Sequence, residues 1–161
     1  MIRISCLNTI LMFILLPNML FAWDGKAVSV TSGDIIKVLK DGKPVAIRLA
    51  AIDCPEKWQP YGNAAKQFTA NLVAGKVVIV WPTFTYRYGR SVAFVFVDDK
   101  SLNKDLLSAG LAWHDTEYSR DPELAKLEFE ARSKKLGLWA EPNPIPPWKW
   151  RKKQQPNRCD R

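Results

Sequence analysis

Three acidic residues within the first 56 positions have the types and spacing of a hard-cation site. Asp34 begins one predicted strand, Asp53 ends the next, and Glu56 follows on the exit loop that Pro55 imposes. Hard cations bind several oxygens from a small region, backbone carbonyls included. Asp34, Asp53 and the Cys54 carbonyl therefore form a candidate site if the two strands are adjacent. The alternative is that these are ordinary turn acids.

Arginines lie on both sides of this cluster in the sequence. Arg48 is five residues before Asp53, so a regular strand would place the two side chains on opposite faces. A bulge or a coiled barrel strand is needed to bring both inward. Arg87 and Arg90 open a later strand, within a stretch, 57–97, that contains no acidic residue. Arginine forks bind phosphate oxygens in pairs, so this stretch is a candidate phosphate-binding surface. The alternative is a solvated basic face.

Carboxylates facing arginines are what phosphodiester hydrolysis requires. A cation polarises the phosphoryl oxygen and orients water, a nearby glutamate can take the proton, and arginine stabilises the developing charge. The chain has one histidine, His114, which excludes mechanisms that need two imidazoles. We interpret His114 as a structural residue.

Length and charge agree with this reading without proving it. The 161 residues suit one domain with a real core, and an apolar content of 47% argues against disorder. The 24 Lys and Arg outnumber the 16 Asp and Glu, for a net charge of +8, which favours a polyanionic partner.

The N-terminal residues have the pattern of an export signal. Residues 1–22 carry one charge, Arg3, then an apolar stretch that ends at Ala22. We expect cleavage after Ala22, a secreted or periplasmic mature protein without a membrane anchor, and a net charge of +7 once Arg3 is lost. The alternative is a retained anchor. The mature chain keeps Cys54 and Cys159, which either form a disulfide or remain as one buried and one exposed thiol.

Periodicity predicts the elements that must position the acids and arginines. Residues 26–53 alternate like three strands, and two further strands are predicted at 77–81 and 92–97. Helical spacing is found at 64–73, at 102–109, and from the Asp121-Pro122-Glu123 start signal to Gly137. This order predicts an α+β, mainly β fold: a five-stranded oligonucleotide-binding (OB-fold) barrel with about three helices.

The C-terminal segment differs from the rest of the chain. Prolines at 142, 144, 146 and 147 predict that no helix forms there, and residues 149–161 contain six basic residues and one acid. We therefore divide the chain into a signal peptide (1–22), a folded domain (23–140) and a proline-rich basic tail (141–161).

Several motifs in this order resemble the staphylococcal nuclease (thermonuclease) family, and in particular its exported bacterial members. The resemblance covers nearly all of the mature chain. The motifs are Ser32-Gly33-Asp34, the run from Arg48 to Glu56, Gln59-Pro60-Tyr61-Gly62, Tyr88-Gly89-Arg90, Leu102-Asn103, Gly110-Leu111-Ala112, Gly137-Leu138-Trp139 and Pro146-Pro147-Trp148.

The resemblance implies a barrel of the predicted type and a calcium-dependent phosphodiesterase that acts on DNA and RNA. By position, it makes Asp34, Asp53 and the Cys54 carbonyl calcium ligands, Glu56 the residue that positions or deprotonates water, and Arg48 and Arg90 the groups that stabilise the transition state. Substrate contacts would come from Arg87, Tyr88 and Tyr118. Many members have an aspartate where this chain has Ser32, which implies weaker calcium binding.

Two function classes remain after this reading. The first is an exported, monomeric, metal-dependent nuclease with little sugar or sequence specificity. The second is a non-catalytic OB-fold module that binds single-stranded nucleic acid through Trp148, Trp150 and the basic tail. Cleavage of single-stranded DNA with and without a chelator distinguishes them.

Overall fold

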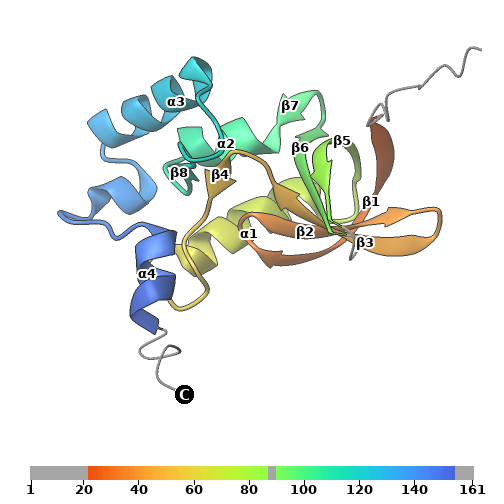
Figure 1. The fold of residues 1–161 in the computed structure, drawn as a ribbon, viewed down its shortest axis with the longest axis horizontal. Coiled ribbons are helices and arrows are strands. Elements are labelled where there is room, and N and C mark those ends of the chain that lie inside the picture. The colour runs from red at the N-terminus through yellow and green to blue at the C-terminus, as the bar shows by residue number, and fades with distance from the viewer. Residues whose placement is uncertain (1–21, 87–89, 155–161) are drawn as a thin grey trace, which may run out of the picture.

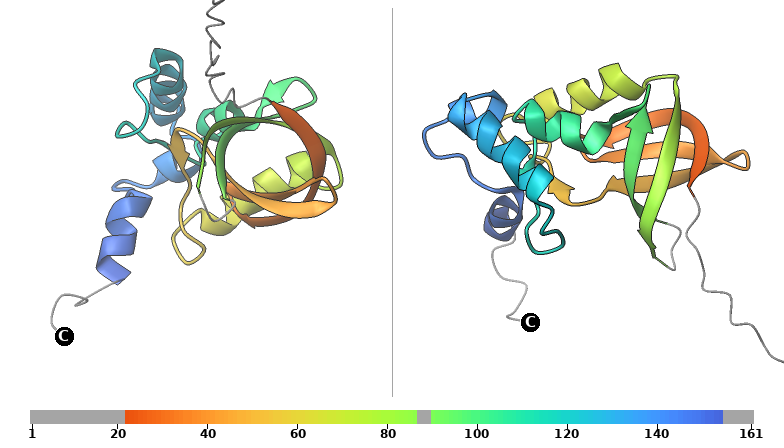
Figure 2. Two further views of the ribbon diagram at one scale, coloured as in Figure 1. Left: turned by 45° about the vertical axis from the view of Figure 1, so that its right-hand side comes forward. Right: turned by 90° about the horizontal axis from the view of Figure 1, so that it is seen from above.

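A closed barrel of five strands forms the larger part of the molecule. The computed structural model describes residues 22–86 and 90–154. The barrel strands are β1 (Trp23–Ser32), β2 (Ile35–Lys40), β3 (Lys43–Leu49), β5 (Val77–Thr85) and β6 (Ser91–Val97). β1, β2 and β3 form an antiparallel meander, β5 pairs with β1, and β6 pairs with β5. A parallel pairing of β3 with β6 closes the barrel, and Figure 2 shows it end-on. The predicted OB-fold barrel is confirmed.

The inward faces of four barrel strands form the buried core. Alternate side chains along β2, β3, β5 and β6 point inward and are buried: Ile36, Val38, Ile47, Leu49, Val78, Val80, Ala93 and Val95. β1 contributes only Ala27 to the buried core. The β2–β3 hairpin turns at Asp41 and Gly42, which both have positive φ, as a tight two-residue hairpin requires.

Helices pack at one end and one side of the barrel (Figure 1). α1 (Gly62–Val73) follows the short strand β4 (Ile52–Asp53), and α2 (Leu102–Ser108) follows β7 (Lys100–Ser101). α3 (Pro122–Ser133) comes after β8 (Trp113–His114), which pairs with β4. The side chain of Asp121 caps α3 by accepting a hydrogen bond from the Glu123 amide at 2.8 Å.

α3 is shorter than predicted. It ends at Ser133 rather than Gly137, because Lys135 adopts a left-handed conformation that closes the last turn. Gly137 instead begins a 3₁₀ turn, η1 (Gly137–Ala140). This turn carries Trp139 onto Trp113, with ring centroids 4.4 Å apart.

The described part of the tail contains a helix, which corrects the prediction that its prolines allow none. α4 spans Pro147–Gln154. Pro147 occupies the first turn, where a missing backbone N–H costs nothing, so the last of the four prolines begins the helix instead of preventing it. Pro147 is buried, and Trp148 packs edge-on against Trp113 with centroids 5.7 Å apart.

In the described ranges, 22–86 and 90–154, no helix is both long enough and apolar enough to cross a membrane. The predicted signal peptide lies outside these ranges except for Ala22.

Candidate active site

The turn that links β3 to β4 brings Arg48 and Asp53 together. β3 ends at Leu49, and the chain turns through Ala50 and Ala51, with Ala51 at φ 63°. Because the chain changes direction between β3 and β4, Arg48 and Asp53 can face each other although an odd number of positions separates them. The buried Asn103 of α2 stabilises this turn, because its Nδ2 donates to the Ala50 carbonyl at 2.8 Å.

Asp34 reaches the same place from the β1–β2 turn. The Ser32 hydroxyl donates to Asp34 Oδ1 at 2.8 Å. Gly33 permits the close packing behind it, since a Cβ there would lie 2.8 Å from the Cys54 sulfur and 2.7 Å from the Ala65 Cβ. The strands β2 and β3 are adjacent, with Ile35 beside Arg48. This adjacency is what a shared cation site of Asp34, Asp53 and the Cys54 carbonyl required.

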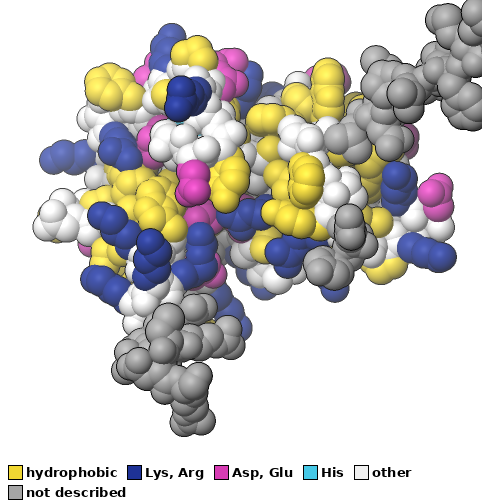
Figure 3. All heavy atoms as spheres, viewed as in Figure 1, with side chains coloured by type: hydrophobic (Ala, Val, Ile, Leu, Met, Phe, Trp, Pro, Cys, Tyr) yellow, Lys and Arg dark blue, Asp and Glu magenta, His cyan; other side chains and the backbone are white. Residues whose placement is uncertain are grey.

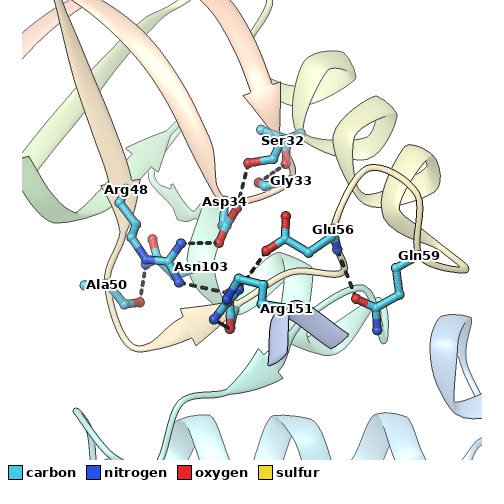
Figure 4. Close-up of polar contacts among 11 residues, drawn as sticks. Ser32, Gly33, Asp34, Arg48, Ala50, Glu56, Gln59, Asn103 and Arg151 are labelled. Carbon is cyan, nitrogen blue, oxygen red and sulfur yellow. Dashed lines mark hydrogen bonds and ion pairs between the residues drawn. The ribbon is translucent and has the colours of Figure 1, made fainter. Parts of the chain in front are cut away.

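Arg48 bridges the two aspartates (Figure 4). Its Nη1 donates to Asp34 Oδ2 and its Nη2 donates to Asp53 Oδ1, both at 2.9 Å. Asp34 is 4% exposed and Asp53 is 1% exposed. Burial raises the pKa of Asp34, and Arg48 and Ser32 offset only part of that effect. Burial alone would lower the pKa of Arg48, but the two carboxylates outweigh it and raise that pKa.

Arg151 of α4 is a site residue that the sequence reasoning missed. Its Nη2 donates to Asp53 Oδ2 at 2.8 Å, and its Nη1 donates to Glu56 Oε1 at 2.7 Å and to Asp53 Oδ1 at 3.2 Å. Hydrogen bonding to Asp53, the largest influence, and then to Glu56 raises the pKa of Arg151 further above its usual range, although burial opposes this. The basic run beside Trp148 was a signal for a contact with acids, but its partner lies 98 residues away.

Glu56 is held by the loop that precedes α1. Its amide donates to Gln59 Oε1 at 3.1 Å, and its carbonyl accepts from the Gln59 amide at 2.9 Å. The Gln59 side-chain amide also donates to the Ile145 carbonyl, which ties this loop to the segment before α4. The Glu56 side chain is 40% exposed, so it can face solvent from an ordered backbone.

A cleft lies beside the two arginines that bind the acids. It has a volume of about 710 Å³ and is bordered by Arg48, Arg151 and the β3–β4 turn. Four aromatic side chains also border it: Phe84 of β5, Tyr86 directly after β5, Phe94 of β6, and Tyr118 of the loop after β8. A second hollow of about 370 Å³ lies beside it, between Asp53, Tyr118 and α4, and Arg151 borders both. In Figure 3, basic side chains gather over α4.

The other predicted site residues have different positions. Tyr118 is 79% exposed and borders both hollows. Arg90 is exposed directly before β6, where its carbonyl accepts from the Tyr86 amide at 2.8 Å, and the structure gives its side chain no bond to the acids. Arg87 and Tyr88 lie outside the described residues. Cys54 is buried and has no disulfide partner among the described residues, and Cys159 lies outside them.

The donor set fits a cation held by two carboxylates. Among residues 22–86 and 90–154, no three Asp, Glu, His or Cys side chains gather closely enough to form a cage of their own. Asp34 and Asp53 are buried oxygen donors, and burial raises the pKa of Asp34. A hard cation at this place would complete its shell with a backbone carbonyl, such as that of Cys54, and with water.

The molecule is an OB-fold barrel that gathers carboxylates and arginines into one cluster. Comparison with known proteins identifies its family. The family model described as "Staphylococcal nuclease homologue" matches residues 46–141. A protein named "Uncharacterized endonuclease" from Escherichia coli O157:H7 is 41% identical, over 86% of this chain and 96% of the relative. The "Staphylococcal-like nuclease CAN1" of Arabidopsis thaliana is 43% identical, over 70% of this chain and 35% of the relative. "Micrococcal nuclease" of Shigella flexneri is 34% identical, over 80% of both chains.

The chain belongs to the staphylococcal nuclease family. It is therefore placed among the nucleases, hydrolases that act on nucleic acid.

Proposed function

We propose that this protein is an exported, calcium-dependent nuclease that hydrolyses phosphodiester bonds of DNA and RNA. The observation that carries the proposal is the guanidinium of Arg48 between two buried carboxylates at the mouth of a 710 Å³ cleft. Calcium is the ion we propose, because it binds hard oxygen donors and because extracellular Ca²⁺ sites need an affinity of only about 10⁻⁴–10⁻³ M. Export rests on the pattern of residues 1–22.

Each site residue has a proposed part in the reaction. Asp34 and Asp53 hold the cation, which supplies Lewis-acid polarisation of the phosphate when it is bound. Glu56 accepts a proton from the attacking water, which its partial exposure on an ordered loop allows. Arg48 and Arg90 donate to the phosphate oxygens as negative charge develops on them.

The aromatic side chains around the cleft are the proposed base-contacting groups. Phe84 and Tyr86 meet edge-on with centroids 4.8 Å apart, and both are about half exposed beside the site. Tyr118 faces them from the loop after β8. Exposed rings accept any base by stacking, which suits a single strand read without sequence preference.

The deciding experiment is digestion of single-stranded DNA and RNA with Ca²⁺ and with chelator. Cleavage should require Ca²⁺. Glu56→Gln should lower kcat by about 10²–10⁴-fold, since it removes the base while keeping the side-chain volume. Arg90→Ala should lower kcat by about 10²–10³-fold.

Three outcomes would overturn the proposal in different ways. Cleavage that survives chelation would remove the cation from the mechanism, and full activity in both variants would remove the proposed residues. Salt-sensitive retention on DNA without cleavage would favour the binding module instead.

A further inference from the structure

Arg151 occupies the carboxylate oxygens of Asp53 that a bound cation would use. Both carboxylate oxygens of Asp53 accept hydrogen bonds from it, at 3.2 and 2.8 Å, and Oδ1 also accepts from Arg48. A cation bonded to Asp53 competes for the same lone pairs. The presence of Arg151 on Asp53 and the presence of the cation there therefore oppose each other.

Of the two arginines, Arg151 is the one free to leave. Arg48 comes from a barrel strand, also binds Asp34, and is 27% exposed. Arg151 is 42% exposed and lies one turn beyond the anchor of α4, where Pro147 is buried and Trp148 packs on Trp113. Its side chain can swing away while the helix stays docked.

Once released from Asp53, the Arg151 side chain can turn into the neighbouring cleft. Arg151 borders both the 710 Å³ cleft that it shares with Arg48 and the 370 Å³ hollow beside it. A nucleic-acid strand that crosses the site would pass its guanidinium, and planar guanidinium groups pair well with phosphate oxygens. Charge favours the exchange, because three carboxylates face two arginines until a divalent cation arrives.

We propose that Arg151 is a third phosphate-binding arginine of this nuclease, held on Asp53 and Glu56 until a divalent cation displaces it. The inference rests on the proposed function and deepens it. Cation binding thereby does two things at once: it fills the carboxylate site, and it frees a side chain that binds the substrate.

The first test measures Ca²⁺ binding to the full mature chain by titration calorimetry without substrate. Arg151→Gln should bind Ca²⁺ about tenfold more tightly than the wild type, since the competitor is gone. Lys149→Gln is the matched control, because it removes the same charge from an exposed position on α4 that forms no ion pair with any residue of 22–86 or 90–154. Its effect should stay below about threefold. Equal effects of the two variants, or weaker binding by Arg151→Gln, would overturn the competition.

The second test measures cleavage of a single-stranded oligonucleotide at saturating Ca²⁺. Arg151→Gln should raise KM by about tenfold and change kcat less, and Arg151→Lys should restore part of the loss. An unchanged KM would overturn the phosphate contact. A wild-type chain that never cleaves would overturn the proposed function instead, while the calorimetry would still decide the competition.

Discussion

At the scale of single residues, Arg48 has a double role that limits how it can be tested. It is the partner of two carboxylates that are almost fully buried. Removing it would leave the buried Asp34 with only the Ser32 hydroxyl and Asp53 with Arg151 alone, and a buried carboxylate that loses its cation destabilises a fold strongly. Loss of activity in an Arg48 variant would therefore mix chemistry with unfolding, and the exposed Arg90 and Glu56 are better probes.

The Cys54 thiol should be unreactive in the folded protein. It is buried beneath Gly33, and burial raises its pKa well above the usual range, so the unreactive protonated form persists at neutral pH. In a Cys159→Ser variant, a thiol reagent should label Cys54 only after denaturation. The measurement is the labelling rate with and without denaturant.

Equal labelling rates in the folded and unfolded chain would contradict this placement of Cys54. With the native Cys159 present, two reactive thiols in the denatured, unreduced protein would exclude a disulfide between the cysteines.

Residue types and spacing predicted much of the site but not all of it. Asp34, Arg48 and Asp53 do meet, because adjacent strands of a meander bring nearby sequence positions together. Arg151 could not be placed in the same way. Its contact with Asp53 depends on how a terminal helix docks, and no local periodicity encodes that distance.

At the scale of elements, the β3–β4 turn depends on α2. Asn103 donates to the Ala50 carbonyl at 2.8 Å and accepts from the Val95 amide at 3.1 Å, so it joins the turn to β6. Asn103→Ala should lower the free energy of unfolding by about 1–3 kcal/mol, because both buried groups lose their partner. Denaturant titration measures the change.

A matched control for this prediction lies on α1. Asn71 is exposed, and its side chain accepts a hydrogen bond only from Gln67 in the part of the chain that the structure describes. Asn71→Ala should change the free energy of unfolding by less than about 0.5 kcal/mol. Equal losses in both variants would show that Asn103 does not stabilise the turn as proposed.

Element boundaries were predicted best where a capping residue marks them. Asp121 caps α3 at the start signal that the sequence showed, and Ser101 caps α2 directly before the predicted helix at 102–109. The prolines before α4 were misinterpreted, since a proline forbids a helix interior but suits a helix start. The two-residue strands β4 and β8 carry too few residues to show any alternation.

At the scale of the whole molecule, α4 contributes to stability as well as to the site. A chain ending at Pro146 loses the buried Pro147 and the packing of Trp148 on Trp113. We expect its free energy of unfolding to fall by about 1–3 kcal/mol, measured by denaturant titration. A chain ending at Gln154 is the control, because it keeps every contact described here.

The two truncated chains also distinguish the roles of the tail. Equal stability of both would show that α4 is an accessory to nucleic-acid binding and not part of the fold. Loss of stability only in the shorter chain would place Trp148 in the core.

The parallel pairing of β3 with β6 makes assembly of the site a late step in folding. The barrel closes only when Arg48 lies beside Val92, and Asp53 meets Arg151 only after 98 more residues have been made and docked. Contacts so distant in sequence form late in folding. On the proposed export route, a chain still threading through a membrane would have no assembled site. On that route, the proposed nuclease would gain its complete site only after residues up to Arg151 have emerged and docked.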